Sequence, residues 1–277
     1  MYKSVHGGDI YSEQNNSLGK NIVDYSANVN PLGLPVSVKE AIKISIKNCV
    51  NYPDPLCREL TEKLAKYLNV KKEYFFISNG AADVLFKLAL AVKPKRAVLL
   101  APTFADYEKA LRTVDCKFTY YDLQEEKNFV AGPELLQKIN SRVDLVVICN
   151  PNNPTGKLMD EDLLVEILEK CCRTGTKLLV DECFMDFVDD EKAYSLCSQL
   201  SKYHNLIILK AFTKTYAMPG LRLGYCITAD AELIRGLHEN GQDWNVSVPA
   251  QAAGIAALDE ENYLLASKDL ILSLIHI

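Results

Sequence analysis

The sequence lacks the features that define several large classes of protein. It contains no run of about 18 apolar residues, so we expect no membrane span and no membrane partner. Residues 1–9 have no apolar core of the kind found in a signal peptide, which predicts a cytoplasmic location. Repeats, low-complexity segments and charged tails are also absent. Ordinary proportions of hydrophobic (48%) and charged (24%) residues instead indicate a folded globular chain.

Metal-binding and nucleotide-binding patterns are absent as well. The nine cysteines are scattered without a C-x-x-C pair and the four histidines are dispersed, so we expect reduced thiols and no metal site. The formal net charge of −5 argues against general binding of nucleic acid. No G-x-G-x-x-G segment opens a helix, which argues against a nicotinamide cofactor. An anionic ligand would therefore need a local pocket.

Short apolar runs alternate with helical patterns along most of the chain. Because continuous apolar strands are typical of sheets covered on both faces, we expect a three-layer α/β/α fold with a mostly parallel central sheet. We predict strands at residues 74–78, 97–101, 117–121, 145–149, 177–181, 206–210 and 224–227. We predict helices at residues 35–49, 58–68, 81–92, 106–113, 133–139 and 161–173, and a nearly continuous helix from residue 248. Functional groups should then gather in the loops that follow the strands.

Several polar residues occupy those loops in a recognisable order. Asp181 ends a buried strand, Lys214 stands 33 positions later and Arg222 follows after eight more. The segment 150–156, Asn-Pro-Asn-Asn-Pro-Thr-Gly, follows another buried strand, and Gly80 precedes a helix. Each signal is weak alone. As an ordered set, the chain resembles the fold-type I aminotransferase superfamily, whose members use pyridoxal 5′-phosphate (PLP).

The resemblance implies roles for these residues. Lys214 would form the Schiff base with the cofactor and return protons, while Asp181 would keep the pyridine nitrogen protonated. The cofactor's phosphate needs backbone N–H groups at a helix start, a hydroxyl and a guanidinium. By resemblance, these groups come from Gly80, Ala81, Ala82, Thr213 and Arg222.

Three further positions complete the cofactor site that the resemblance implies. Asn153 would bond the phenolic oxygen of the cofactor, and Phe104 would stack on its ring. Tyr52, in Asn-Tyr-Pro-Asp, would reach the phosphate of the cofactor in a neighbouring subunit. The last role implies a homodimer with shared active sites.

The N-terminal residues narrow the resemblance. The segment 6–11, His-Gly-Gly-Asp-Ile-Tyr, is followed by Ser-Ala-Asn-Val-Asn-Pro-Leu-Gly at 26–33, a pairing similar to the threonine-phosphate decarboxylase family of the cobalamin pathway. Phe184 stands where related transaminases usually carry tyrosine, which is similar to the decarboxylase pattern. The implied substrate is a small phosphorylated amino acid, O-phospho-L-threonine, converted to aminopropanol phosphate. The implied substrate ligands are His6, Gly7, Asn30 and Asn153.

Two other functions stay open at this point. A PLP-dependent aminotransferase acting on histidinol phosphate or another amino acid is the nearest alternative, and a non-catalytic PLP-fold fragment is a different one. The apolar end of the sequence suggests a truncated chain. We therefore expect residues 1–34 to contribute to the substrate site, 35–247 to form the PLP-binding large domain and 248–277 to begin the connection to a truncated C-terminal small domain. In such families that domain supplies arginines for the substrate's carboxylate and phosphate.

Overall fold

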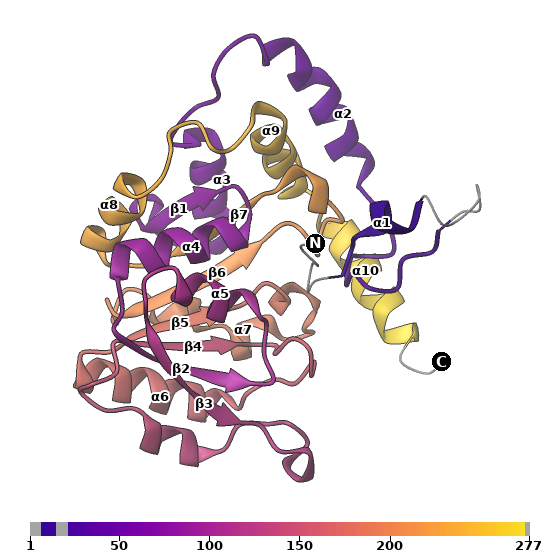
Figure 1. Ribbon diagram of the computed structural model, residues 1–277. Coiled ribbons are helices and arrows are strands. Elements are labelled where there is room, and N and C mark those ends of the chain that lie inside the picture. The colour runs from indigo at the N-terminus through magenta and orange to yellow at the C-terminus, as the bar shows by residue number, and fades with distance from the viewer. Residues whose placement is uncertain (1–6, 15–21, 275–277) are drawn as a thin grey trace.

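A seven-stranded mixed sheet organises the computed structural model, which describes residues 7–14 and 22–274 (Figure 1). The strand order is β1-β7-β6-β5-β4-β2-β3. The strands are β1 (Phe75–Ser78), β2 (Arg96–Ala101), β3 (Lys117–Asp122), β4 (Leu145–Cys149), β5 (Lys177–Asp181), β6 (Leu206–Ala211) and β7 (Gly224–Ile227). Strand β7 pairs antiparallel with β1 and β6, whereas β3, β2, β4, β5 and β6 pair in parallel. The parallel strands bring the loops that follow them to one edge of the sheet.

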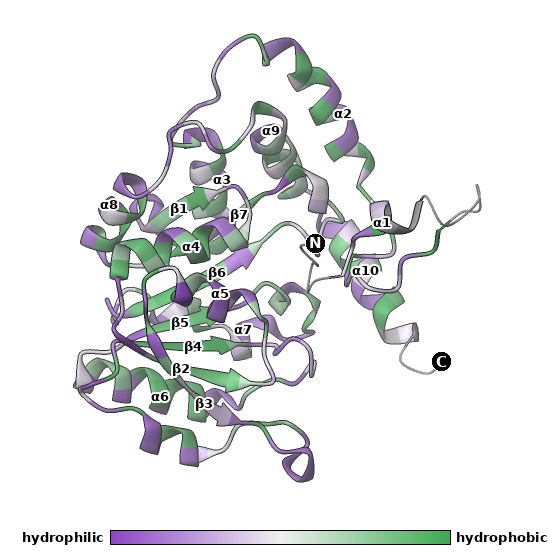
Figure 2. Ribbon diagram, viewed as in Figure 1, coloured by the Kyte–Doolittle hydropathy of each residue, from purple (hydrophilic) through white to green (hydrophobic). Residues whose placement is uncertain are grey.

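Helices cover both faces of this sheet, as the predicted three-layer fold requires. The α-helices are α1 (Ile10–Gln14), α2 (Val36–Ser45), α3 (Arg58–Leu68), α4 (Ala81–Val92), α5 (Asp106–Arg112), α6 (Glu161–Thr174), α7 (Glu191–Tyr194), α8 (Ala231–Glu239), α9 (Val248–Ala257) and α10 (Glu261–Leu274). One hydrophobic cluster joins the sheet to α4, α5 and α8, and the other joins it to α3, α6 and α9. Strands β2 and β4 between them are strongly hydrophobic, whereas the edge strand β3 is not (Figure 2).

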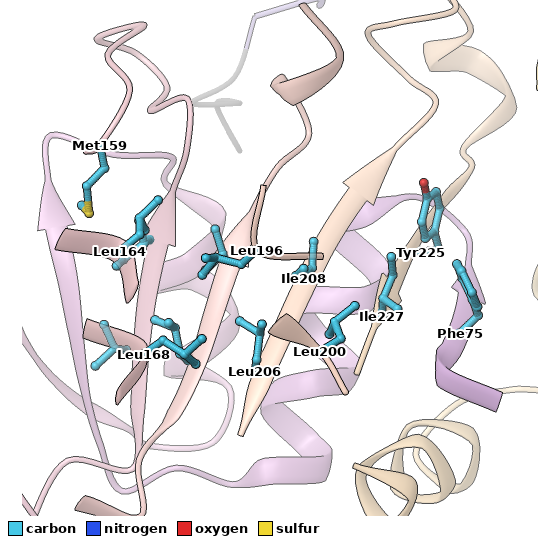
Figure 3. Packing of buried hydrophobic residues seen from close by; sticks show 14 of the residues in the cluster. Phe75, Met159, Leu164, Leu168, Leu196, Leu200, Leu206, Ile208, Tyr225 and Ile227 are labelled. Carbon is cyan, nitrogen blue, oxygen red and sulfur yellow. The ribbon is translucent and has the colours of Figure 1, made fainter. Parts of the chain in front are cut away.

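Burial on both faces explains why the strands are so apolar. Every residue of β4 and of β6 is buried. In Figure 3, Leu164 and Leu168 of α6 lie on the same face of the sheet as Leu206 and Ile208 of β6, and Leu196 stands between Leu164 and Ile208. Burying a side chain of this size stabilises the fold by about 1.5–3 kcal/mol. The alternation of short apolar runs and helices was therefore a sound basis for predicting the sheet.

The helices differ from the sequence prediction in several places: the short helices α1 and α7 were not predicted, α2 ends at Ser45, and three further differences follow. Residues 133–138 form a short 3₁₀ helix (Pro133–Lys138) in place of an α-helix, as is common for such short segments. Helix α8 was not predicted; it begins where the Asp230 side chain accepts a hydrogen bond from Leu233 N. The helix expected to continue from residue 248 is interrupted between α9 and α10. There Asp259 pairs with Lys63 of α3 at 2.5 Å and Glu260 accepts a hydrogen bond from Ser37, so both side chains are anchored to other helices.

The edge where the parallel strands end faces α1 and α10 (Figure 1). Asn30 connects that side to the sheet, because its Nδ2 donates to Ser267 Oγ of α10 and to the backbone oxygen of Thr215. Within residues 7–14 and 22–274, no helix has the length and apolar character needed to cross a membrane. The same residues contain no group of three or more histidine, cysteine, aspartate or glutamate side chains arranged to hold a metal ion.

Candidate active site

A cavity of about 440 Å³ opens at the edge where β4, β5 and β6 end. The loops after these strands, the start of α4 and the segment leading into α5 form its walls. Ten residues singled out in the sequence line it, namely Gly7, Ala81, Ala82, Phe104, Asn153, Asp181, Phe184, Thr213, Lys214 and Arg222. The fold thus brings together side chains that are up to 215 positions apart in the chain (from 7 to 222).

Asp181 is the acidic group at the floor of the cavity. It ends β5 and is only 5% exposed. Its Oδ1 accepts the backbone N–H of Cys183 at 2.9 Å, and its Oδ2 accepts the hydroxyl of Tyr107 at 2.6 Å. Burial raises the pKa of Asp181, against the opposing effect of these two hydrogen bonds. The structure therefore holds the Asp181 carboxyl group in one orientation at the cavity.

Lys214 is the amine of the cavity and follows the end of β6 by three residues. Burial lowers the pKa of Lys214, and the positive charge of Arg222 lowers it further. The backbone oxygen of Lys214 accepts the N–H of Asn30 at 3.1 Å, which fixes the loop from outside the cavity. A lysine with a lowered pKa has a larger neutral fraction, the form that can attack a carbonyl group.

An anion cradle lies at the start of α4. Gly80 has a φ of +92°, and a Cβ built on it would lie 2.9 Å from Nη2 of Arg222. Gly224 lies close to the start of α4, because a Cβ at that position would lie 2.4 Å from the backbone nitrogen of Ala81. The Arg222 guanidinium therefore packs against the first turn of a twelve-residue helix, whose free N–H groups attract anions. Thr213 lines the same cavity and adds a hydroxyl.

The walls that carry Phe104 and Asn153 are joined by a residue that the motif analysis did not single out. Asn152 is buried, its Nδ2 donates to the backbone oxygen of Pro102 at 3.1 Å, and its Oδ1 accepts the Thr103 hydroxyl at 2.9 Å. These bonds hold the segment 150–156 against the loop after β2. The ring of Phe104 meets the ring of Tyr107 edge-on, with centroids 5.6 Å apart.

Two of the residues proposed from the sequence do not line this cavity, and the structure does not describe a third. Asn30 is 3% exposed and does not line this cavity; its amide is engaged by Thr215 and Ser267. Tyr52 is 78% exposed and stacks on Trp244, with ring centroids 4.6 Å apart. His6 lies outside the described residues. The sequence roles of all three stay predictions.

Gly7 is the described part of the N-terminal motif, and it lines the cavity. A Cβ at this position would lie 1.9 Å from the backbone oxygen of Ser26, so only glycine fits. The next residue, Gly8, donates its N–H to Ser26 Oγ at 2.7 Å. The glycine pair therefore brings the N-terminal segment to the mouth of the cavity.

A second cavity of about 450 Å³ adjoins the first. The two share Asn28, Asn153, Pro154 and Phe184 as walls. The other walls of the second cavity are largely apolar and include Ile271 of α10. Phe184 therefore stands between the region of Asp181 and Lys214 and a neighbouring space.

The first cavity fits PLP by the chemistry of its walls. A phosphate matches the cradle at Gly80 and Arg222, a ring nitrogen matches the buried carboxylate of Asp181, and an aldehyde matches the amine of Lys214. The close approach of Arg222 to Gly80 is the most specific of these features, because any larger residue at position 80 would displace the guanidinium. The geometry thus agrees with the cofactor that the motifs imply.

Comparisons with known proteins agree with this geometry. A family model described as aminotransferase class I and II matches residues 20–275. The threonine-phosphate decarboxylase of Salmonella typhimurium is 33% identical over 270 residues, which cover 96% of this chain and 73% of that protein. The histidinol-phosphate aminotransferase of Caldicellulosiruptor saccharolyticus is also 33% identical, over 95% of this chain and 73% of its own length.

Solved structures show the same fold. The histidinol-phosphate aminotransferase from Clostridium acetobutylicum has a TM-score of 0.82 and 31% identity, and the match covers 89% of this chain and 72% of that one. The L-threonine-O-3-phosphate decarboxylase from Porphyromonas gingivalis has a TM-score of 0.75 at 24% identity, over 88% of this chain and 71% of that one. At the latter identity the match speaks for the fold alone.

Proposed function

The chain belongs to the class I and II aminotransferase family of PLP-dependent enzymes, and from that premise we propose that it decarboxylates O-phospho-L-threonine to aminopropanol phosphate. The Cα–carboxylate bond breaks, carbon dioxide leaves and a proton takes its place at Cα. When bound, PLP supplies an electron sink for the negative charge that develops at that carbon. The product is the phosphorylated amino alcohol of the cobalamin pathway.

We assign cofactor binding and proton transfer to different residues of the cavity. Arg222, Thr213 and the first turn of α4 hold the phosphate of the cofactor, and Asp181 holds a proton at its ring nitrogen. Phe104 packs on the ring. Lys214 would hold the cofactor through Nζ and, with substrate bound, would donate a proton to Cα, for which its lowered pKa suits it.

The observation that carries the choice of decarboxylation is Phe184. It lines both cavities beside Asn153 and presents no hydroxyl there, in keeping with the decarboxylase pattern. Two threonine-phosphate decarboxylases support this choice, the second being a putative one from Caldanaerobacter subterraneus at 34% identity. Gly7 at the cavity mouth also supports a substrate role for the N-terminal motif, in which we retain His6, Asn30 and Asn153 as proposed ligands.

Transamination is the second candidate, because histidinol-phosphate aminotransferases match the chain at the same identity. Both reactions use the same cofactor site. They differ in which bond of Cα is held for cleavage, and this depends on how the substrate's carboxylate and phosphate are anchored. The substrate contacts therefore decide between the two reactions.

The proposed assembly is a cytoplasmic homodimer with shared sites. Tyr52 supports it, because a tyrosine that is 78% exposed and held by Trp244 is available to a second subunit. All nine cysteines are free thiols, as is usual for cytosolic proteins. Neither a nucleic acid nor a membrane is part of the proposal. We also keep the division into residues 1–34, 35–247 and 248–277 as the proposed domain organisation.

The deciding experiment supplies O-phospho-L-threonine to the PLP-loaded full gene product without any keto acid. We expect release of carbon dioxide and aminopropanol phosphate in equal amounts, and none from the Lys214→Ala variant. If the substrate persists, while histidinol phosphate with 2-oxoglutarate is converted, the aminotransferase is the correct function. Conversion of neither substrate would reject both candidates.

A further inference from the structure

Tyr107 is a residue of the cavity that no motif singled out. It lies in the first turn of α5 and is 2% exposed, yet its hydroxyl reaches Oδ2 of Asp181 at 2.6 Å. The other carboxylate oxygen is held by the backbone N–H of Cys183 at 2.9 Å. Because the two donors come from different elements, α5 and the loop after β5, they prevent the carboxylate from rotating. A buried tyrosine hydroxyl normally finds a hydrogen-bond partner, and here that partner is the carboxylate proposed to face the cofactor.

The electrostatics of Tyr107 and Asp181 indicate what this hydrogen bond does. Burial raises the pKa of Asp181, which favours its neutral form. Burial and the charge of Asp181 raise the pKa of Tyr107 well above its ordinary value, so Tyr107 stays a protonated donor. A donor to a carboxylate stabilises the ionised form. The thiol and backbone N–H of Cys183, the hydroxyl of Tyr107 and the positive charge of Lys210 all lower the pKa of Asp181 and so counteract the effect of burial. Among them, the Tyr107 hydroxyl is the donor from α5.

A second contact links Tyr107 to the cofactor site. Its ring meets the ring of Phe104 edge-on, at 5.6 Å between centroids and 80° between planes. Phe104 is the residue proposed to pack on the cofactor ring. One side chain thus contacts both groups that flank the proposed position of that ring.

We propose that Tyr107 is a positioning residue whose hydroxyl holds the Asp181 carboxylate ionised and in one orientation for the ring nitrogen of PLP. The inference rests on the proposed role of Asp181 in cofactor binding and goes beyond it. Tyr107 does not itself touch the reacting atoms. It acts through Asp181, so its removal should change how cofactor binding depends on pH.

The test measures PLP binding rather than turnover. Tyr107→Phe removes one oxygen and keeps the ring, and with it the contact with Phe104. We expect the pH below which PLP affinity falls to move upward by about one unit, because a hydrogen bond to a charged group corresponds to about a tenfold change or more. Dissociation constants from the absorbance of the lysine-bound cofactor, measured across pH, give this profile. Circular dichroism of the cofactor-free variant reports whether it is folded.

Tyr121→Phe is the matched control. Tyr121 is also buried, at 8% exposure, and its hydroxyl lies 3.4 Å from the Glu134 carboxylate, outside the cavity. We expect its PLP profile to match that of the wild type. In an Asp181→Asn background, removal of the Tyr107 hydroxyl should no longer shift the profile, because no carboxylate remains to ionise.

The outcomes separate the inference from the proposed function. If the wild-type protein does not bind PLP, the proposed function fails. If the wild type binds PLP and Tyr107→Phe has the same profile, or is weaker by one constant factor at every pH, the positioning role is overturned. A shift that persists in the Asp181→Asn background would overturn it too.

Discussion

Replacing Gly80 by alanine tests the anion cradle at a single carbon atom. Gly80 precedes α4 with φ +92° and ψ 160°, a region that residues with a side chain rarely adopt. Its Cβ would lie 2.9 Å from Nη2 and 3.3 Å from Cζ of Arg222. The guanidinium must therefore move away from the first turn of α4 in the Gly80→Ala variant.

The structure gives an approximate size for two effects. Backbone strain of this kind costs about 1–3 kcal/mol of folding free energy. Loss of a hydrogen bond between a guanidinium and a phosphate costs about 1.5–3 kcal/mol, which corresponds to a PLP dissociation constant raised about 10- to 100-fold. The second effect concerns the phosphate alone. Pyridoxal, which lacks the phosphate, should therefore bind the variant and the wild type nearly equally.

The assay is a titration of each cofactor form, followed by the absorbance of the lysine-bound species. Gly220→Ala is the matched control, because Gly220 lies in the loop of Arg222 and a Cβ there would meet nothing within 4 Å. Adding Arg222→Ala to Gly80→Ala should weaken PLP binding little further, since both act on one guanidinium. Equal losses of affinity for PLP and pyridoxal would refute the reasoning.

Two further predictions concern stability. Asn30→Ala leaves the buried backbone oxygen of Thr215 without its side-chain donor and should lower the free energy of unfolding by about 1–3 kcal/mol. An unchanged urea unfolding curve for the cofactor-free protein would contradict a stabilising role for this hydrogen bond. Asp230→Ala should lower it by about 1–2 kcal/mol near neutral pH, through loss of the α8 cap. Burial raises the pKa of Asp230, but the hydrogen bond from Lys177 lowers it more, so the pKa in the folded protein lies below 3.8. This stabilisation is therefore present above pH 3.8 and is lost as the pH falls through the lowered pKa, so the two unfolding curves should converge in acid.

Most of the sheet was predictable because its strands, apart from the edge strand β3, are buried on both faces. A run such as Leu145–Cys149 leaves no position for a polar residue, so its apolar character marks it directly. The break between α9 and α10 was not predictable from periodicity. At the break, Asp259 and Glu260 contact helices about 200 positions earlier in the chain, and no local pattern indicates such contacts.

The same distinction applies to the site. Asp181 and Lys214 could be proposed because the first ends a recognisable strand and the second follows another, within a known order of motifs. The bond between Tyr107 and Asp181 spans 74 positions, and the bond between Asn30 and Ser267 spans 237. No local pattern encodes such pairs. Chemistry-bearing residues are therefore visible in the sequence, whereas the residues that hold them in place become visible only in the fold.

A buried group of charged side chains connects the segment that carries Asp181 to the segment that carries Lys214. Asp181 and Glu182 are adjacent and turn to opposite sides of the sheet edge, so Glu182 lies in the core, where the Lys210 amine is 3.6 Å from its Oε2. The same amine is 3.4 Å from Oδ1 of Asp186, whose Oδ2 accepts the hydroxyl of Thr215 at 2.9 Å.

Thr215 follows Lys214 directly, so this chain of contacts joins the backbone that carries Asp181 to the backbone that carries Lys214. Buried ion pairs contribute little net stability compared with apolar packing, because removing charges from water costs nearly as much as their attraction returns. Their value here is geometric. The core fixes the two loops before any ligand arrives, so the energy of ligand binding is not spent on bringing the acid and the amine together.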